Sequence, residues 1–274
     1  VLGKKFQTLF KKYCLDSFKK YCKKHNLGLI ILNDLIVEKQ NLLPPFDKNP
    51  NLHRLLIPKE IKRLYPRYKY LADIDADCLP TSIARNIFDY AKFNNEKEKK
   101  IYLVSPNPSN FSKEMLGKRL SLLRKEYLNK KFPLNSILSG SDKDIKRIFK
   151  LKFKGPIATV GTFVAPSKVL IECYENIISR IIKNSKTYMY LEHYTNETFR
   201  SFAKIHWLPY EFQAIWDYEV ALNYPFLMKK INNNYLLKTC IDATMSRVDM
   251  LHFAGSWPPN DVFKDKILKQ NNKD

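Results

Sequence analysis

Residues 70–80 read YLADIDADCLP, and the architecture of the chain can be inferred from this segment. The first five residues form an apolar run with the length of a buried strand. Aspartates alternate with apolar residues at positions 73, 75 and 77, so on an extended backbone all three point to one face. Ligands of α/β sheets bind beyond the carboxyl ends of the strands. The segment therefore predicts an α/β protein with a ligand site at the edge of its sheet.

The three aspartates favour binding of a divalent cation. An ionised carboxylate removed from water costs several kcal/mol unless it is paired or bound to a metal. Asp73, Asp75 and Asp77 also repel one another and gain from sharing a cation. Oxygen ligands favour Mg²⁺, Ca²⁺ or Mn²⁺ over Zn²⁺. A solvated turn is the alternative, which the apolar residues on both sides of the aspartates disfavour.

Two other aspartate motifs fit the segment less well. A calcium-binding loop starting at Asp73 would need Gly and Glu where the chain has Cys78 and Ala84. A phosphatase with a nucleophilic aspartate would need a nearby hydroxyl residue to hold the phosphate, and residues 75–79 contain none.

The flanking sequence continues the α/β pattern. Residues 1–32 are expected to form a strand, an amphipathic helix and a second strand at Leu29–Leu32. Further apolar runs predict strands at 101–104 and at 157–165, the latter interrupted by Gly161. Ser167 is expected to cap a long helix that ends near Ile182. We expect one compact domain.

The composition supports a globular protein with anionic partners. With 274 residues, of which 45% are hydrophobic, the chain can bury a core and is too apolar to be disordered. The net charge of +21 attracts anions, but the basic residues are spread along the chain, as expected for a solvated surface. Five cysteines without a C-x-x-C pair predict reduced thiols and no structural zinc. No apolar stretch reaches the roughly 20 residues that cross a bilayer, so we expect a cytoplasmic or membrane-peripheral protein.

Residues 70–80 resemble the D-x-D segment of GT-A fold glycosyltransferases, in which an apolar strand ends in aspartate, any residue, aspartate. Asp75 and Asp77 match these two positions. The resemblance implies a Rossmann-like mixed sheet flanked by helices, in a single domain with an elaborated C-terminal half. Residues 1–105 would form the nucleotide-binding half and residues 106–274 the acceptor-binding half. It also implies that Mn²⁺, or else Mg²⁺, bridges the phosphates of a nucleotide sugar, with a UDP-sugar as the favoured donor.

Three other segments strengthen the resemblance. The opening of the chain resembles the nucleotide-binding half of the family, and residues 159–163 resemble its central strand, where a turn of small residues faces the sugar. Residues 251–256 resemble a C-terminal motif in which a histidine completes the metal site and a glycine approaches the diphosphate. The donor-binding residues implied by the resemblance are Leu2, Gly3, Asp73, Gly161, Thr162, Gly255 and Ser256, and the implied metal ligands are Asp75, Asp77 and His252.

An acidic segment at residues 216–219 resembles the part of these enzymes that faces the acceptor or the donor sugar. A catalytic base must reach the acceptor hydroxyl by a hydrogen bond. Asp217 is the first candidate and Glu219 the second, although Glu192, Glu197 and Glu211 are equally eligible by sequence. Four aromatic residues are candidates for stacking on sugar rings, although core packing is the commoner role of such residues: Trp207, Tyr210, Trp216 and Trp257.

The sequence thus predicts a metal-dependent glycosyltransferase that uses a nucleotide-sugar donor. Its acceptor would be a glycan or a lipid-linked glycan, anionic to match the basic surface, with peripheral contact to a membrane. Retention or inversion of the anomeric centre is left open. Two alternatives also remain: a metal-dependent nucleic-acid enzyme or binder, although we do not expect nucleic acid as the partner, and a catalytically silent protein with a GT-A-like fold.

Overall fold

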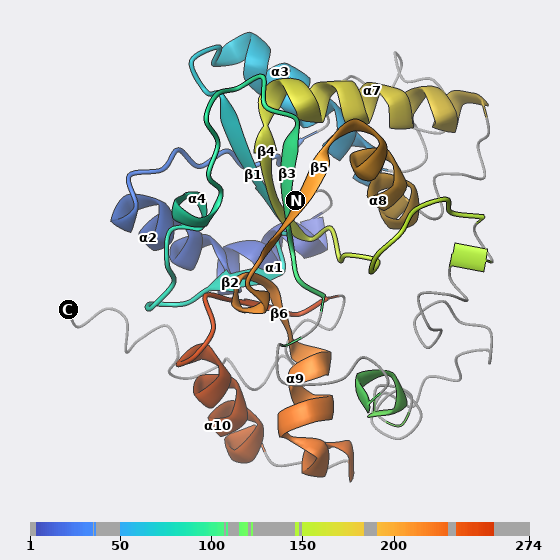
Figure 1. The fold of residues 1–274 in the computed structure, drawn as a ribbon. Coiled ribbons are helices and arrows are strands. Elements are labelled where there is room, and N and C mark those ends of the chain that lie inside the picture. The colour runs from blue at the N-terminus through green and yellow to red at the C-terminus, as the bar shows by residue number, and fades with distance from the viewer. Residues whose placement is uncertain are drawn as a thin grey trace.

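The sheet edge that carries the aspartates lies at the centre of the computed structural model (Figure 1). The structure describes residues 4–34, 36, 50–106, 108, 115–119, 122, 146–147, 150–183, 191–229 and 234–254. The described strands are β1 (Tyr70–Ile74), β2 (Cys78–Pro80), β3 (Lys100–Val104), β4 (Thr162–Pro166), β5 (Lys204–Leu208), β6 (Ala214–Ile215) and β7 (Met250–His252).

Within these residues the strands form two mixed sheets. The larger has the order β1-β4-β3-β5, in which β4 is antiparallel to both neighbours and β5 is parallel to β3. The smaller has the order β2-β7-β6, in which β2 is antiparallel and β6 parallel to β7. Because β1 and β2 are joined by the short turn at residues 75–77, the two sheets meet at the aspartates.

Helices flank the larger sheet and extend the molecule below the smaller one (Figure 1). The α-helices in the described part of the chain are α1 (Lys4–Tyr13), α2 (Leu15–Lys24), α3 (Ile57–Leu64), α4 (Ile87–Tyr90), α7 (Ser167–Lys183), α8 (Leu191–Phe202), α9 (Trp216–Asn223) and α10 (Asn234–Met245). Three 3-10 helices accompany them: η2 (Pro50–Leu56), η4 (Tyr210–Gln213) and η5 (Pro225–Lys229). Among the described residues, no helix is both long enough and apolar enough to span a bilayer.

The core explains the apolar runs of the sequence. Every residue of β4 is buried, because Phe163 and Ala165 pack in a cluster with α7 and α8 while Val164 packs with residues of α4 on the other face. Such two-sided burial produces a continuous apolar strand. A second large cluster joins α1 and α2 to the smaller sheet and to α9 and α10. The predicted mixed sheet flanked by helices, in one compact domain, is confirmed.

Two of the predicted strands are wrong or too long. Leu29–Leu32 has no regular secondary structure, because its apolar side chains Leu29 and Ile31 pack against the helical cluster around α1 and α2 while Ile30 is exposed. The strand predicted at 157–165 begins only at Thr162. The side chains of α8 hydrogen-bond the preceding backbone and take the place of a neighbouring strand. The strand at Lys100–Val104 and the helix that starts at Ser167 are confirmed.

Candidate functional site

The turn after β1 presents the aspartates in a fixed arrangement. The amide of Asp75 donates to the carbonyl of Gly161 (2.7 Å), and the carbonyl of Asp75 accepts from the amide of Cys78 (3.0 Å). These two bonds close the turn and anchor it to the segment that precedes β4. The carboxylates of Asp75 and Asp77 therefore project from a turn after the strand, at its carboxyl end as predicted, and not from the extended backbone that the alternating pattern predicted.

The smaller sheet brings His252 to this turn from the far end of the sequence. Cys78 pairs with His252 across β2 and β7, and the amide of Phe253 donates to the carbonyl of Asp77 (3.1 Å). His252 Nε2 lies 3.1 Å from Asp77 Oδ1 and 3.8 Å from Asp75 Oδ2. Two carboxylates and one imidazole, 175 residues apart in the case of Asp77 and His252, thus meet at one point.

Gln213 completes the surroundings of the imidazole. Its Nε2 lies 3.0 Å from His252 Nδ1, and among the described residues its buried Oε1 has no hydrogen-bond partner. When His252 carries its proton on Nε2 and donates it to Asp77, its Nδ1 can accept a hydrogen bond from the amide nitrogen of Gln213. A rotation of the amide would turn the oxygen toward Nδ1, so that Nδ1 becomes the donor and the Nε2 lone pair can bind a cation. Gln213 can therefore support both states of the ring.

Arg54 fixes two of the three aspartates. Its Nε and one terminal nitrogen donate to the two oxygens of Asp73, both at 2.9 Å, and its other terminal nitrogen donates to Asp75 Oδ1 (2.8 Å). Asp73 also accepts from the hydroxyl of Tyr174 (3.4 Å). Asp73 is thus held in a supporting position, while Asp75 keeps Oδ2 directed toward His252.

Gly161 lies so close to the side chains of the cluster that a Cβ atom at this position would clash with them. A Cβ at this position would come within 2.7 Å of Asp75 Oδ2 and 2.9 Å of His252 Cε1, and would also meet the amide nitrogen of Gln213. Only glycine is therefore compatible with this arrangement. Thr162, the next residue, is fully buried, and its hydroxyl lies 3.8 Å from the thiol of Cys78.

The charges of the cluster are not balanced. Partial burial raises the pKa of Asp75, opposed by Arg54 and His252 and reinforced by the other aspartates. Burial alone would lower the pKa of His252, but the hydrogen bond that it donates to Asp77 and the negative charges of Asp77 and Asp75 raise it. The carboxylates thus outnumber the single arginine bonded to them, an arrangement in which a further cation is favoured.

Glu192 is a further acidic group close to the cluster. It lies on the first turn of α8 and accepts from the amide of Val160 (3.3 Å), next to Gly161. Burial raises its pKa to about 7, the Val160 amide opposes this shift, and the charge of Asp75 adds to it. Glu192 was one of several acidic residues that the sequence could not rank, and only the register of α8 against residues 156–160 brings it here.

The predicted site residues thus divide into three groups. The structure brings together the six residues Asp73, Asp75, Asp77, Gly161, Thr162 and His252. Leu2, Gly3, Gly255 and Ser256 lie outside the described residues, as does Trp257. Asp217 is half-buried on the first turn of α9, two residues after Ile215, which pairs with His252. Glu219 is buried, forms an ion pair with Arg247 and accepts from Asn223 (2.8 Å).

Sequence reasoning missed Arg54 and Gln213. Arg54 interrupts an apolar stretch at residues 52–56, and a lone arginine in such a stretch near an unbalanced acidic cluster could have suggested a partner for it. Gln213 carried no signal in the sequence. Trp207 is 42% exposed, whereas Tyr210 and Trp216 belong to the core.

The donor set fits a divalent cation. Asp75, Asp77 and His252 supply the carboxylate and imidazole ligands suited to Mn²⁺ or Mg²⁺, and the Gln213 oxygen, once the amide is rotated, would be the outer partner that a metal-bound histidine requires. The ligand atoms of Asp77, Cys78 and His252 also lie within 4.8 Å of one another. Burial, followed by the charges of the neighbouring aspartates, raises the pKa of Cys78 well above its ordinary value, which keeps the thiol neutral and a poor ligand.

Comparison with known proteins relates this geometry to a fold. No protein-family model matches the chain, and no curated protein sequence matches it. The structure is similar to a crystal structure of a glycosyltransferase involved in the glycosylation of the major capsid of PBCV-1, with a TM-score of 0.52 and 10% identity, covering 93% of this chain and 89% of that one. This chain has a glycosyltransferase fold.

A second solved structure is more distantly similar. The apo structure of the bifunctional glycosyltransferase WbbM matches with a TM-score of 0.38 and 15% identity, over 74% of this chain and 31% of that one. The predicted glycosyltransferase fold rests on the first similarity, which spans both proteins almost completely. In this glycosyltransferase fold, the aspartate turn and His252 lie where the two sheets meet.

Proposed function

We propose that the protein transfers a sugar from a nucleotide-sugar donor to a glycan or lipid-linked glycan acceptor, with a divalent cation bound by Asp75, Asp77 and His252. One observation carries this proposal. Two carboxylates at the end of a sheet strand and a histidine from the last described strand converge within 3.8 Å, in a glycosyltransferase fold. Mn²⁺ is the favoured ion because an imidazole joins the oxygen ligands.

A divalent cation at this position would neutralise the charge that develops on the departing diphosphate. The residues around it prepare the site. Arg54 orients Asp75 through a bond to one oxygen and leaves the other oxygen toward His252. Gly161 has no Cβ, which lets Asp75, His252 and Gln213 pack directly against the backbone at this point. The surplus of 21 positive charges draws an anionic donor toward the protein.

A carboxylate must also position or activate the acceptor hydroxyl. Asp217 remains the first candidate, because it follows the strand that pairs with β7 and is only half-buried. Glu192 is the alternative, because its carboxylate interacts with the charge of Asp75. Glu219 is the weaker candidate, since Arg247 and Asn223 occupy one of its oxygens.

The test is a thermal-shift panel with UDP, GDP, CDP and dTDP, each with and without Mn²⁺. A nucleotide at about 100 times its dissociation constant should stabilise the protein by about 2.7 kcal/mol, and the stabilisation should require the cation. One responding nucleotide would identify the donor class.

Two conservative substitutions, a test variant and its matched control, check the role of the aspartates. Asp75→Asn should remove the cation-dependent shift, whereas Asp242→Asn, at an exposed ion pair with Lys238 on α10, should keep it. The proposal fails if no nucleotide responds in the presence of Mn²⁺. It fails equally if Asp75→Asn responds as the unsubstituted protein does.

A further inference from the structure

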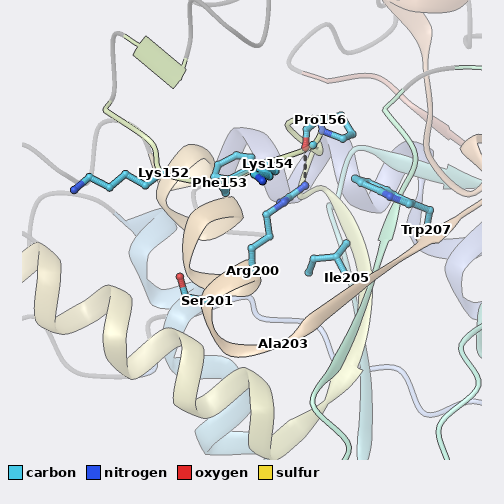
Figure 2. A pocket seen from close by; sticks show the side chains of 10 residues that line it. Lys152, Phe153, Lys154, Pro156, Arg200, Ser201, Ala203, Ile205 and Trp207 are labelled. Atoms are coloured by element: carbon cyan, nitrogen blue, oxygen red, sulfur yellow. Dashed lines mark hydrogen bonds between the residues drawn. The ribbon is translucent and has the colours of Figure 1, made fainter.

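A second hollow lies at the end of α8 away from the aspartates (Figure 2). It has a volume of about 430 Å³. Its wall combines cationic and aromatic side chains from three elements: Lys152, Phe153 and Lys154 from the segment before β4, Arg200 from α8, and Trp207 from β5. Nothing in the proposed function uses this pocket.

Arg200 forms the floor of the pocket in a fixed orientation. It donates to the carbonyl of Pro156 (2.6 Å) and to the side-chain oxygen of Asn196 (2.9 Å). Its guanidinium lies 4.4 Å from the ring centre of Phe153 and 5.8 Å from that of Trp207. The structure therefore holds a cation between two aromatic rings, with the indole of Trp207 42% exposed.

The segment at residues 152–156 forms one wall of the pocket. Gly155 has a φ of +87°, a conformation that favours glycine, and this turn carries Phe153 back over Arg200. Lys146 donates to the carbonyl of Gly155 and lies 4.6 Å from the ring centre of Phe153. Lys152 and Lys154 are both exposed; in Figure 2 Lys154 lies beside Phe153, whereas the Lys152 side chain extends away from Arg200 and Trp207.

The same face of α8 connects this pocket to the aspartate cluster. Glu192, Asn196 and Arg200, spaced four residues apart, bind Val160, Ala158 and Pro156 in turn. The rise along the helix axis from Glu192 to Arg200 is about 12 Å. Arg200 and the pocket therefore lie at the opposite end of this helix face from Glu192, whose carboxylate interacts with the charge of Asp75.

We propose that this pocket is an acceptor subsite that binds an anionic sugar unit of the glycan, some units away from the hydroxyl that receives the new sugar. This proposal rests on the proposed function. The exposed face of Trp207 suits the apolar side of a pyranose ring. The fixed guanidinium of Arg200 and the neighbouring Lys154 suit a carboxylate or phosphate carried by that ring, and Lys152 adds positive charge to the surface beside the pocket.

A glycan suits the pocket better than single-stranded nucleic acid does. Proteins that bind single strands line a basic groove with successive aromatic platforms for successive bases. Here one exposed indole, that of Trp207, lies in a single hollow, on the helix face whose other end carries Glu192 about 12 Å away along the axis. Nucleic-acid binding is therefore an outcome that the test must exclude.

The test measures binding of the intact protein by isothermal titration calorimetry at one fixed ionic strength. The probes are a galacturonate hexamer, a neutral glucose hexamer and an RNA hexanucleotide. Trp207→Ala and the double variant Lys152→Ser, Lys154→Ser should each weaken galacturonate binding about tenfold. Two controls should change the affinity by less than about twofold: Tyr235→Ala, which removes an exposed ring on α10, and Lys19→Ser, Lys23→Ser, which removes the same charge from α2.

Each outcome decides the matter. The proposal is overturned if the pocket variants bind galacturonate as the controls do, if the neutral hexamer binds as tightly, or if RNA binds more tightly and depends on Trp207. A parallel titration with UDP, GDP, CDP and dTDP, each with Mn²⁺, separates the two proposals. If galacturonate binding depends on Trp207 but none of the four nucleotides binds, the pocket is supported and the proposed donor chemistry is wrong. If a nucleotide binds but galacturonate binding does not depend on Trp207, the donor chemistry is supported and the acceptor subsite is wrong.

Discussion

The acidic side chains of the interior fall into two regions that balance their charge in different ways. At the end of β1, Asp73 and Asp75 share one arginine, Arg54, and Asp77 contacts His252. Around α9 and β7, each buried carboxylate of the described residues has an arginine of its own. Glu219 pairs with Arg247, and Asp249 accepts three bonds from the guanidinium of Arg85.

The difference separates acidic residues that build the fold from those available to a ligand. A buried carboxylate with its own arginine is neutral as a pair, and removal of either partner leaves an uncompensated charge. A cluster with surplus negative charge lowers its energy by protonation or by binding a cation. The first region is therefore the better candidate for chemistry, and the second for stability. Four predictions follow this contrast, in order of decreasing effect.

Substitution of one ligand should abolish transfer and spare the fold. Asp77→Asn should reduce Mn²⁺-dependent transfer by at least about a thousandfold, or about 4 kcal/mol, because the amide is a poor cation ligand. Asp249→Asn should instead destabilise the protein and leave the rate per folded molecule unchanged. Steady-state rates with the responding nucleotide sugar, together with urea denaturation, check both variants. A normal rate for Asp77→Asn would remove the distinction between the two regions.

Loss of an arginine should be repaired by a cation in the first region only. Arg54→Gln should destabilise the metal-free protein by about 3 kcal/mol, because two carboxylates lose their shared partner. Mn²⁺ should restore much of that loss. Arg85→Gln is the matched substitution at Asp249, and Mn²⁺ should not restore its stability. Denaturant titrations with and without Mn²⁺ measure all four values, and equal rescue of both variants would contradict the contrast.

Glu219→Gln should affect stability more than catalysis. The substitution leaves Arg247 without a charged partner, but the arginine side chain is 45% exposed, so the expected loss is about 2 kcal/mol. The value of kcat measured well below the melting temperature should be unchanged. A loss of kcat in the fully folded variant would show that Glu219 is the catalytic carboxylate.

The metal-free protein should lose stability as the pH rises toward neutrality. Burial raises the pKa of Glu192 from an ordinary 4.5 to about 7, so between these values the folded state retains a proton that the unfolded state releases. Below pH 4.5 Glu192 is protonated in both the folded and the unfolded state, so its contribution to stability is fully present. This contribution is lost as the pH rises from 4.5 through 7. Glu192→Gln should flatten this part of the profile, by several degrees in the melting temperature. Melting curves in a chelating buffer test it, and an unchanged slope would exclude Glu192 as the source.

The sequence predicted the aspartate turn well because its information is local. Four of the five residues from Tyr70 to Ile74 are apolar, which favoured a strand, and the aspartates at its end marked the acidic site. The alternation at 73, 75 and 77 was less informative, because residues 75–77 form a turn and not an extended strand. The long helix from Ser167 was predictable for the same reason. The structure of Leu29–Leu32 was not predictable in this way. An apolar run indicates that a segment is buried, but it does not show whether the segment is a strand in a sheet or irregular chain packed against helices.

Other parts of the candidate site depend on long-range contacts that no local pattern encodes. Arg54, Gln213 and Glu192 reach the cluster only through the packing of η2, η4 and α8 around the sheet. By itself the sequence determined the chemistry available at residues 73–77, since residue type and spacing set charge and geometry within a strand. Only the tertiary structure decided which acidic groups receive an arginine of their own and which remain unbalanced, because that depends on contacts between segments far apart in the chain.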